Sequence, residues 1–281
     1  MKIGIIGLGL IGGSFALAMK KRTNDFSFLG WDQSAEHLQK ALDLGIIDEA
    51  APSMEALLAH CDWIVLAIPV NVIEQLVPEI LGKLKPNQFL VDFGSTKQAI
   101  CAAVDSHPKR NQYLAAHPIA GTEYSGPEAA FANLFEDKVM IVCDEEATDG
   151  RAIGTFRKWC KMIGMTTTYL SSADHDKHLA YVSHLSHVIA FGLSNTVLKE
   201  EEHDERLLDL AGSGFASTVR LAKSSPDMWT PIFMKNRAAI LQGVNNYLTE
   251  VEHFKKLLEA GDEAGIKSFL EKGRAIRKIL K

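Results

Sequence analysis

The chain has 281 residues, of which 47% are hydrophobic and 23% charged, and this length predicts about two domains with a core that needs no disulfide. Its 30 Lys and Arg against 35 Asp and Glu leave a formal net charge of −5, which argues against a nucleic-acid partner, because such proteins usually present a basic face. No apolar run approaches the roughly 18 residues of a membrane helix, and the start has no signal-peptide layout. We therefore expect a cytoplasmic protein with free thiols and no membrane partner.

Short apolar runs alternate with helical patterns over residues 1–171. The run at 62–68 is continuously apolar, as expected for a strand that helices cover on both faces. Ser34 is placed to cap a helix that stops at Gly45. This alternation is typical of βαβ units and a mostly parallel sheet. We expect an α/β domain with helices such as 11–22 and 153–162, and with strands at 2–6, 26–31, 62–68, 89–92, 113–116, 139–143 and 166–170.

The pattern changes to purely helical spacing from residue 172 onward. Apolar residues recur every three or four positions, and no strand signal interrupts them. We therefore predict a separate all-α domain over residues 172–281, with helical segments at 175–198, 207–223, 228–258 and 263–281.

A glycine-rich stretch at residues 7–12 (GLGLIG) matches GxGxxG, directly after one strand and at the start of a helix. In this motif Gly7 permits a tight turn, Gly9 lets a pyrophosphate approach the backbone, and Gly12 lets the helix pack against the strand. Asp32, 20 residues after Gly12, can accept hydrogen bonds from a ribose and would repel a 2′-phosphate. We expect a Rossmann-type domain that binds NAD in preference to NADP; the alternative is a turn without a ligand.

Ser95 and His117 follow two neighbouring predicted strands. Because parallel strands end at one edge of the sheet, both residues are expected beside the nicotinamide end of a bound dinucleotide. A loop histidine, whose ordinary pKa is about 6.5, can accept a proton from an alcohol while hydride leaves. His117 is therefore the candidate base, and the alternative is a histidine that caps neighbouring backbone.

The helical region adds a further group of polar residues. His184 and His187 are three residues apart and share a helix face. His175 and His178 repeat that spacing and raise a zinc alternative, but no cysteine lies close by and a histidine base needs no metal, so we expect none. Arg220, in a small and apolar segment, requires an anion, which is either a substrate carboxylate or an internal acid.

Several segments together resemble the prephenate/arogenate dehydrogenase family over nearly the whole chain. They are GLGLIGGS at 7–14, LDLGIIDEA at 42–50, DFGSTK at 92–97, HPIAGTEYSG at 117–126, SHLSH at 183–187 and the Arg220 and Trp229 pair. The resemblance implies a homodimer with an N-terminal Rossmann-type domain and a helical dimerisation domain. It also implies a small-molecule substrate: prephenate is oxidatively decarboxylated to 4-hydroxyphenylpyruvate in tyrosine biosynthesis, with NAD reduced to NADH. Ser186 stands where many relatives have proline, and we expect it to preserve the helix.

The resemblance also assigns roles to the candidate residues. His117 would draw the proton from the ring hydroxyl, and Ser95 would orient it and touch the nicotinamide. Substrate carboxylates would be bound by Arg220 and His187, with neighbouring contacts from His184, Ser183, Thr122, Glu123 and Trp229. The cofactor would lie against Gly7, Gly9, Leu10, Ile11, Gly12, Asp32 and Pro69.

Three alternatives stay open. Arogenate, in which an amine replaces the keto group of prephenate, is the nearest rival substrate. Another Rossmann-fold oxidoreductase of hydroxy acids or imines would carry a catalytic lysine where this chain has histidines and an arginine. A dinucleotide-sensing regulator would keep the glycine motif but would have no use for His117, Ser95 and Arg220 together.

Overall fold

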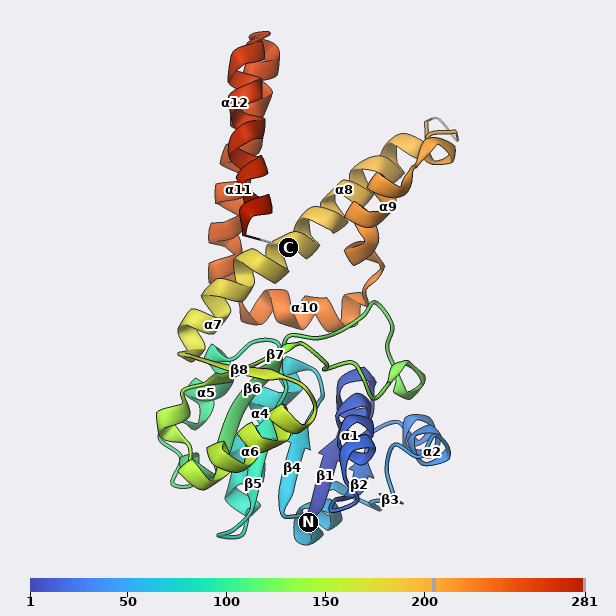
Figure 1. The fold of residues 1–281 in the computed structure, drawn as a ribbon, viewed down its shortest axis with the longest axis vertical. Coiled ribbons are helices and arrows are strands. Elements are labelled where there is room, and N and C mark those ends of the chain that lie inside the picture. The colour runs from blue at the N-terminus through green and yellow to red at the C-terminus, as the bar shows by residue number, and fades with distance from the viewer. Residues whose placement is uncertain (204–205, 280–281) are drawn as a thin grey trace. The chain divides into compact units, whose positions relative to one another are not determined.

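The computed structural model describes residues 1–203 and 206–279. It contains two compact units, Met1–Asn236 and Arg237–Lys281, and Figure 1 colours them along the chain. The boundary predicted between residues 171 and 172 falls within the first unit and stays a prediction.

The first unit is built on an eight-stranded sheet in the order β3-β2-β1-β4-β5-β6-β7-β8. Neighbouring strands run parallel, except that β6 and β7 pair antiparallel. The α/β Rossmann-type class is confirmed, and the two-residue β3 was not predicted. The strands are β1 (Lys2–Ile6), β2 (Ser27–Trp31), β3 (Glu49–Ala50), β4 (Trp63–Leu66), β5 (Phe89–Asp92), β6 (Tyr113–Pro118), β7 (Val139–Cys143) and β8 (Thr166–Leu170).

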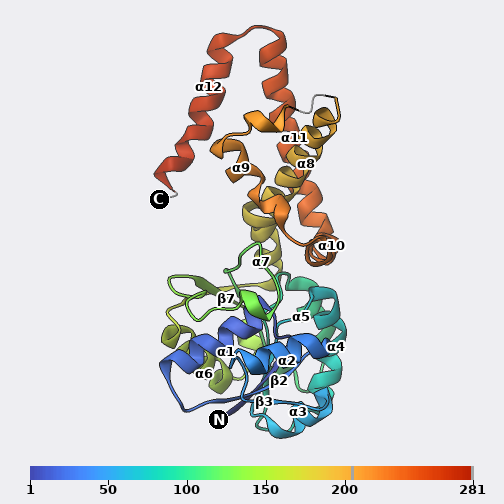
Figure 2. The same cartoon turned by 90° about the vertical axis from the view of Figure 1, so that its right-hand side faces the viewer.

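Helices cover both faces of the sheet (Figure 2). Alternation along β4 explains its unbroken apolar sequence, because Val65 enters one apolar layer while Ile64 and Leu66 enter the other. Ser34 caps α2 as predicted, accepting a hydrogen bond from the backbone N–H of His37. All four cysteines are buried and free. The helices of this part are α1 (Leu10–Arg22), α2 (Ala35–Asp43), α3 (Met54–His60), α4 (Val70–Lys83), α5 (Gln98–Val104) and α6 (Gly150–Met162).

Only helical elements follow β8 among the described residues. The predicted helix at 175–198 is confirmed as α7 (Ser172–Leu179), a π-helical turn (Ala180–His184) and α8 (Leu185–Glu201), with Ser186 inside the helix. The helical segment predicted over 207–223 is divided: α9 (Ser213–Val219) begins after Gly212 and lies between 3₁₀ turns at Leu208–Leu210 and Arg220–Lys223.

The helical segment predicted over 228–258 is also divided. It consists of α10 (Pro226–Lys235) and α11 (Arg237–Glu259), which meet at Asn236. The side chain of Asn236 is buried and donates to a backbone carbonyl of α7. Apolar periodicity does not reveal such a break, since it depends on a contact distant in sequence.

In the second unit, α11 and α12 (Glu263–Arg274) are joined by a turn in which Gly261 has a φ of +63°. The rings of Phe254 and Phe269 pack with centroids 5.2 Å apart. A 3₁₀ turn, Ala275–Lys278, follows, and the last two residues of the helix predicted at 263–281 lie outside the described residues. Within the described ranges, no helix has the length and apolar character needed to span a bilayer.

Candidate active site

The glycine-rich turn between β1 and α1 has the shape that a dinucleotide requires. Gly7 has a φ of +93°, in the left-handed region, and a Cβ on Gly12 would overlap the carbonyl oxygen of Gly7. At Gly9 a Cβ would meet only the backbone nitrogen of Gly126, at 4.0 Å. Backbone conformation and packing therefore explain Gly7 and Gly12 but not Gly9. The open space in front of Gly9 fits a ligand that touches the backbone.

The N-terminus of α1 carries no side-chain cap and no acidic residue in its first turn. Its unpaired N–H groups, including those contributed by Leu10 and Ile11, fit the phosphates of a dinucleotide. Pro69 is exposed and begins α4 directly after β4, the strand beside β1. Because the strand order reverses direction between β1 and β4, both segments lie at the switch point where such sheets bind ligands.

Asp32 lies just beyond the end of β2, as predicted. Its Oδ2 accepts from the backbone N–H of Leu8 at 2.9 Å, and its Oδ1 accepts from that of Ser34 at 2.9 Å. A carboxylate has about four acceptor positions, so these bonds fix Asp32 against the glycine turn and still leave lone pairs for ribose hydroxyls. The arrangement fits NAD at this turn.

His117 lies within β6, opposite Ile141 of β7. Its predicted position in a loop after the strand is wrong, because pairing with the antiparallel β7 extends β6 through Pro118. Burial holds the pKa of His117 well below its usual value, and the nearby charges of His175 and Lys97 act in the same direction. The imidazole is therefore neutral near pH 7 and can accept a proton.

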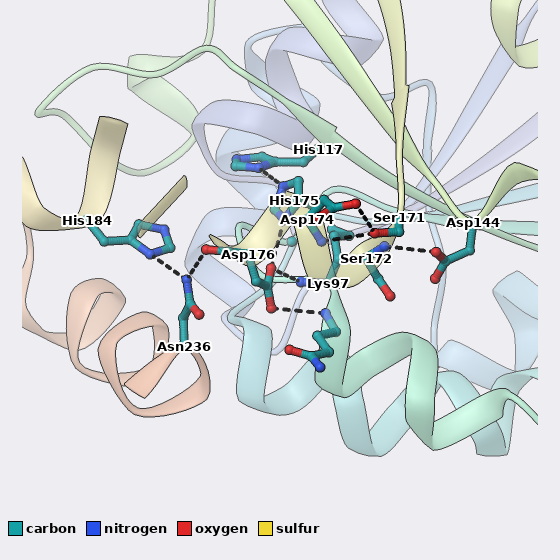
Figure 3. Close-up of polar contacts among 12 residues, drawn as sticks. Lys97, His117, Asp144, Ser171, Ser172, Asp174, His175, Asp176, His184 and Asn236 are labelled. Carbon is teal, nitrogen blue, oxygen red and sulfur yellow. Dashed lines mark hydrogen bonds and ion pairs between the residues drawn. The ribbon is translucent and has the colours of Figure 1, made fainter. Parts of the chain in front are cut away.

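Figure 3 shows a hydrogen-bonded chain behind His117. Its Nδ1 lies 2.8 Å from Nε2 of His175, and Nδ1 of His175 lies 2.7 Å from Oδ1 of Asp176. His175 and Asp176 are both buried. From the sequence, His175 is a candidate only for a metal site and Asp176 is not a candidate. The acid directly after His175 is the one local signal, because their partner His117 is distant in sequence.

Ser95 lies half-buried in the loop after β5. The orienting contact to His117 in the structure comes from His175, so the role proposed for Ser95 stays a prediction. The loop itself is fixed by the buried carboxylate of Asp92, which accepts from the Lys97 ammonium, from the Tyr113 hydroxyl at 2.6 Å and from the Gly94 N–H at 2.8 Å.

A second histidine, His184, is held from the helical side. Nδ2 of Asn236 donates to the carbonyl of Asp176 at 2.6 Å and lies 3.1 Å from Nδ1 of His184. Because that amide nitrogen is a donor, Nδ1 of His184 accepts, and the neutral ring carries its proton on Nε2. Burial lowers the pKa of His184 to about 4. The π-helical turn that carries Ser183 and His184 is of a kind often found at functional sites.

His187 and Trp229 form a stacked pair, with ring centroids 3.5 Å apart and planes inclined by 27°. Nδ1 of His187 donates to the backbone carbonyl of Ser183 at 3.0 Å. Trp229 also meets His184 edge to face. Its indole N–H is buried and lacks a hydrogen-bond partner among the described residues. Such an orphaned donor fits an acceptor group on a ligand.

Arg220 and Glu123 form an ion pair, with Nη1 of Arg220 3.6 Å from Oε2 of Glu123. The arginine side chain is 54% exposed, and exposed pairs of this kind contribute little to stability. Glu123 lies in the loop after β6, where Thr122 accepts a hydrogen bond from the N–H of Tyr124 at 3.2 Å. Thr122 also lines a surface pocket with Tyr124, Ser125, Glu128, Ala129 and Phe131.

Two family models match this chain. The first, "Prephenate dehydrogenase, nucleotide-binding domain", matches residues 15–169, and the second, "Prephenate dehydrogenase, dimerization domain", matches residues 171–272. The chain belongs to the prephenate dehydrogenase family. The resemblance and the enzyme class predicted from its motifs are confirmed: the protein is a dehydrogenase.

Individual proteins of the family are similar over most of their length. Prephenate dehydrogenase of Bacillus subtilis (strain 168) is 31% identical over 279 residues, which span 97% of this chain and 74% of that protein. The structure of A. aeolicus prephenate dehydrogenase in complex with hydroxyphenyl propionate and NAD+ matches with a TM-score of 0.90 and 29% identity, covering 100% of this chain and 98% of that one. Synechocystis arogenate dehydrogenase matches with a TM-score of 0.81 and 26% identity over 100% of both chains.

Proposed function

We propose that this chain is an NAD-dependent prephenate dehydrogenase that forms 4-hydroxyphenylpyruvate and carbon dioxide in tyrosine biosynthesis. The observation that carries the proposal is a neutral His117, backed by a hydrogen-bonded chain, at the carboxyl edge of a sheet whose glycine turn fits a dinucleotide. Similarity to the A. aeolicus enzyme, whose structure contains NAD+ and an aromatic acid, supports it.

His117 would act as the base at the ring hydroxyl. Its Nε2 takes the hydroxyl proton as the O–H bond breaks, and the freed electron pair forms a carbonyl at the ring carbon. Bound NAD supplies the acceptor for the hydride that leaves this carbon. Loss of carbon dioxide then returns its bonding pair to the ring, and His117 returns the proton to the phenolate oxygen that results. Because the ring becomes aromatic, the residues need to supply only positioning and the movement of one proton to His117 and back.

The two carboxylates of the substrate dianion require hydrogen-bond donors at the end away from the ring hydroxyl. Arg220 offers a forked guanidinium, and the orphaned Trp229 indole N–H offers a further donor beside His187. His184 carries its proton on Nε2, so it also donates when neutral. We propose Arg220 as the carboxylate-binding residue, with His187, Ser183, His184, Thr122, Glu123 and Trp229 around it.

Similarity to the Synechocystis arogenate dehydrogenase makes arogenate the alternative substrate. Its ammonium group would need a free carboxylate. Glu123, an acid of the loop after β6, is engaged by Arg220, which favours prephenate. For the cofactor, Asp32 favours NAD over NADP because a 2′-phosphate would meet its negative charge.

We also propose a homodimer of this chain in the cytoplasm. A match to a dimerization domain supports the dimer. Several large apolar side chains of α11 are exposed, including Leu241, Leu248 and Val251, and such faces are typical of interfaces between copies. Free, buried cysteines fit a reducing compartment.

The test offers prephenate and arogenate in parallel, each with NAD and with NADP, and follows reduced cofactor by absorbance. We expect the highest kcat/KM for prephenate with NAD. A higher kcat/KM for arogenate would overturn the substrate assignment, and equal use of NADP would overturn the role of Asp32.

His117→Asn should lower kcat by about 10²-fold or more, the usual range for loss of a general base. Binding of NAD, measured by quenching of tryptophan fluorescence, should be unchanged. His178→Asn is the matched control, since His178 is exposed on α7 and outside the site. Near-normal turnover of His117→Asn would refute its role as the base.

A further inference from the structure

The carboxylate of Asp176 accepts every hydrogen bond that it makes. Oδ1 receives the backbone N–H of Lys97 at 2.8 Å, Oδ2 receives that of Gln98 at 3.0 Å, and Nδ1 of His175 lies 2.7 Å from Oδ1. An ionised carboxylate has no proton to donate. The proton in the contact with His175 therefore belongs to the histidine, on Nδ1.

This fixes which nitrogen of His117 is free. A neutral His175 with its proton on Nδ1 has only a lone pair on Nε2, and that atom faces Nδ1 of His117 at 2.8 Å. His117 must therefore donate from Nδ1, which leaves the lone pair on Nε2. Burial lowers the pKa of His175 as well as that of His117, so both rings are neutral near pH 7.

We propose that His175 and Asp176 are positioning residues that set the tautomer of His117, so that Nε2 is its proton acceptor. The inference deepens the proposed function and rests on it. When the substrate O–H bond breaks and the Nε2–H bond forms, the new positive charge on His117 faces His175 and, behind it, the Asp176 carboxylate. In this arrangement no further proton has to move until the proton returns to the product.

Hydrogen bonds from α5 and from the end of α10 hold Asp176, and with it the row of His117, His175 and Asp176, in place (Figure 3). The carboxylate of Asp176 caps the start of α5, while its backbone carbonyl accepts from Asn236 at the end of α10. His175 and Asp176 are 0% and 2% exposed. Besides each other, the charged and titratable groups that shift the pKa of His117 and His175 are Lys97, Asp92, Asp176 and His184.

The most direct test reads the tautomer without substrate. Nitrogen-15 NMR of histidine-labelled enzyme with NAD bound should show Nδ1 of His117 protonated and Nε2 unprotonated at pH 7. In Asp176→Asn the new amide can donate to Nδ1 of His175, which reverses both rings. We expect Nε2 of His117 to become protonated and kcat to fall by about 10²-fold or more, with the affinity for NAD unchanged. An unchanged tautomer in this variant would overturn the proposal.

The Asp176→Asn variant has only one side-chain oxygen for the backbone N–H groups of Lys97 and Gln98, so it could lose stability. A second variant avoids this problem. His175→Gln leaves Asp176 in place, and His178→Gln on the exposed side of α7 is its matched control. We expect His175→Gln to lower kcat more than it raises KM. The acid limb of kcat/KM should move, because His175 accepts the Nδ1 proton of His117. Full activity with an unmoved pH profile would refute the positioning role.

A double variant separates this inference from the proposed function. In a His117→Asn background, His175→Gln should cause no further loss of kcat, because residues that act as one unit are not additive. Additive losses would show a merely structural role for His175. If His117→Asn alone has no effect, the proposed base is wrong; if only the His175 and Asp176 variants are silent, the base stands and the positioning role fails.

Discussion

Arg220 and Glu123 come from distant segments of the chain, and their side chains lie 3.6 Å apart. Arg220 could serve to bind a substrate carboxylate or only to pair with this acid, and substitutions of the two residues separate these roles. If Arg220 binds a substrate carboxylate, Arg220→Ala should raise KM for prephenate by about 10-fold or more, because a charged hydrogen bond contributes about 1.5–3 kcal/mol. Glu123→Gln removes the same ion pair and leaves the guanidinium in place, so it should leave KM far less changed. Equal increases in KM for the two variants would show that the ion pair alone matters.

Single residues show what local motifs can and cannot predict. Motif and chemistry indicate His117 and Arg220, the resemblance adds Glu123, and Arg220 and Glu123 form an ion pair in the structure. His175, Asp176 and Asn236 were not selected as site residues, although a continuous set of contacts links them to His117 and His184. Their importance depends on partners far away in sequence, which neither periodicity nor local motif spacing encodes.

At the scale of elements, the turn between β1 and α1 predicts two glycine substitutions with opposite phenotypes. Gly9→Ala should fold with nearly unchanged thermal stability, because a Cβ there meets no protein atom closer than 4.0 Å. It should nevertheless weaken NAD binding, since the methyl group takes the space predicted for the pyrophosphate. Gly12→Ala should lower the melting temperature, because its Cβ would overlap the carbonyl of Gly7.

The two variants control for each other when melting temperature and NAD affinity are measured on the same samples. A Gly9→Ala protein that binds NAD with normal affinity would contradict the position assigned to the diphosphate. A Gly12→Ala protein with an unchanged melting temperature would contradict the close packing of α1 on the turn.

Helices and strands were predictable where their burial leaves an apolar pattern in the local sequence. The strands that helices cover on both faces, such as β4, are continuous apolar runs and were found from the sequence. The two-residue β3 is exposed and lies at the sheet edge, so it has no apolar run to signal it. The π-helical turn at Ala180–His184 and the separation of α10 from α11 were also missed, because apolar spacing of about 3.6 residues continues through them.

At the scale of the whole molecule, the proposed dimer predicts a solution mass of about twice the 30.9 kDa of one chain. Leu248→Glu places a charge on the exposed apolar face of α11 and should shift the population toward monomer in sedimentation velocity. Glu252→Gln, an exposed position on the same helix, is the control. A monomer in the unsubstituted chain would contradict the dimer, and an unshifted Leu248→Glu dimer would place the interface elsewhere.

Global stability should depend on pH through the same histidines that form the site. The pKa of His184 is about 4 in the folded protein, against about 6.5 when unfolded. Between these values the unfolded chain binds more protons, so stability is full above about pH 6.5 and falls as the pH drops toward 4. At pH 5 the loss from His184 alone is about 2 kcal/mol. Burial also lowers the pKa of His117, His175 and His187, so their losses have the same sign.

Urea unfolding of the chain at pH 7 and pH 5 measures this difference directly. His184→Gln replaces the titrating ring with an amide that does not titrate, so the free energy of unfolding should change less between the two pH values than in the unsubstituted chain. Lost contacts lower the stability of the variant at both pH values alike, and only the slope with pH reports the histidine. An equal slope in both proteins would show that the acid sensitivity arises outside His184.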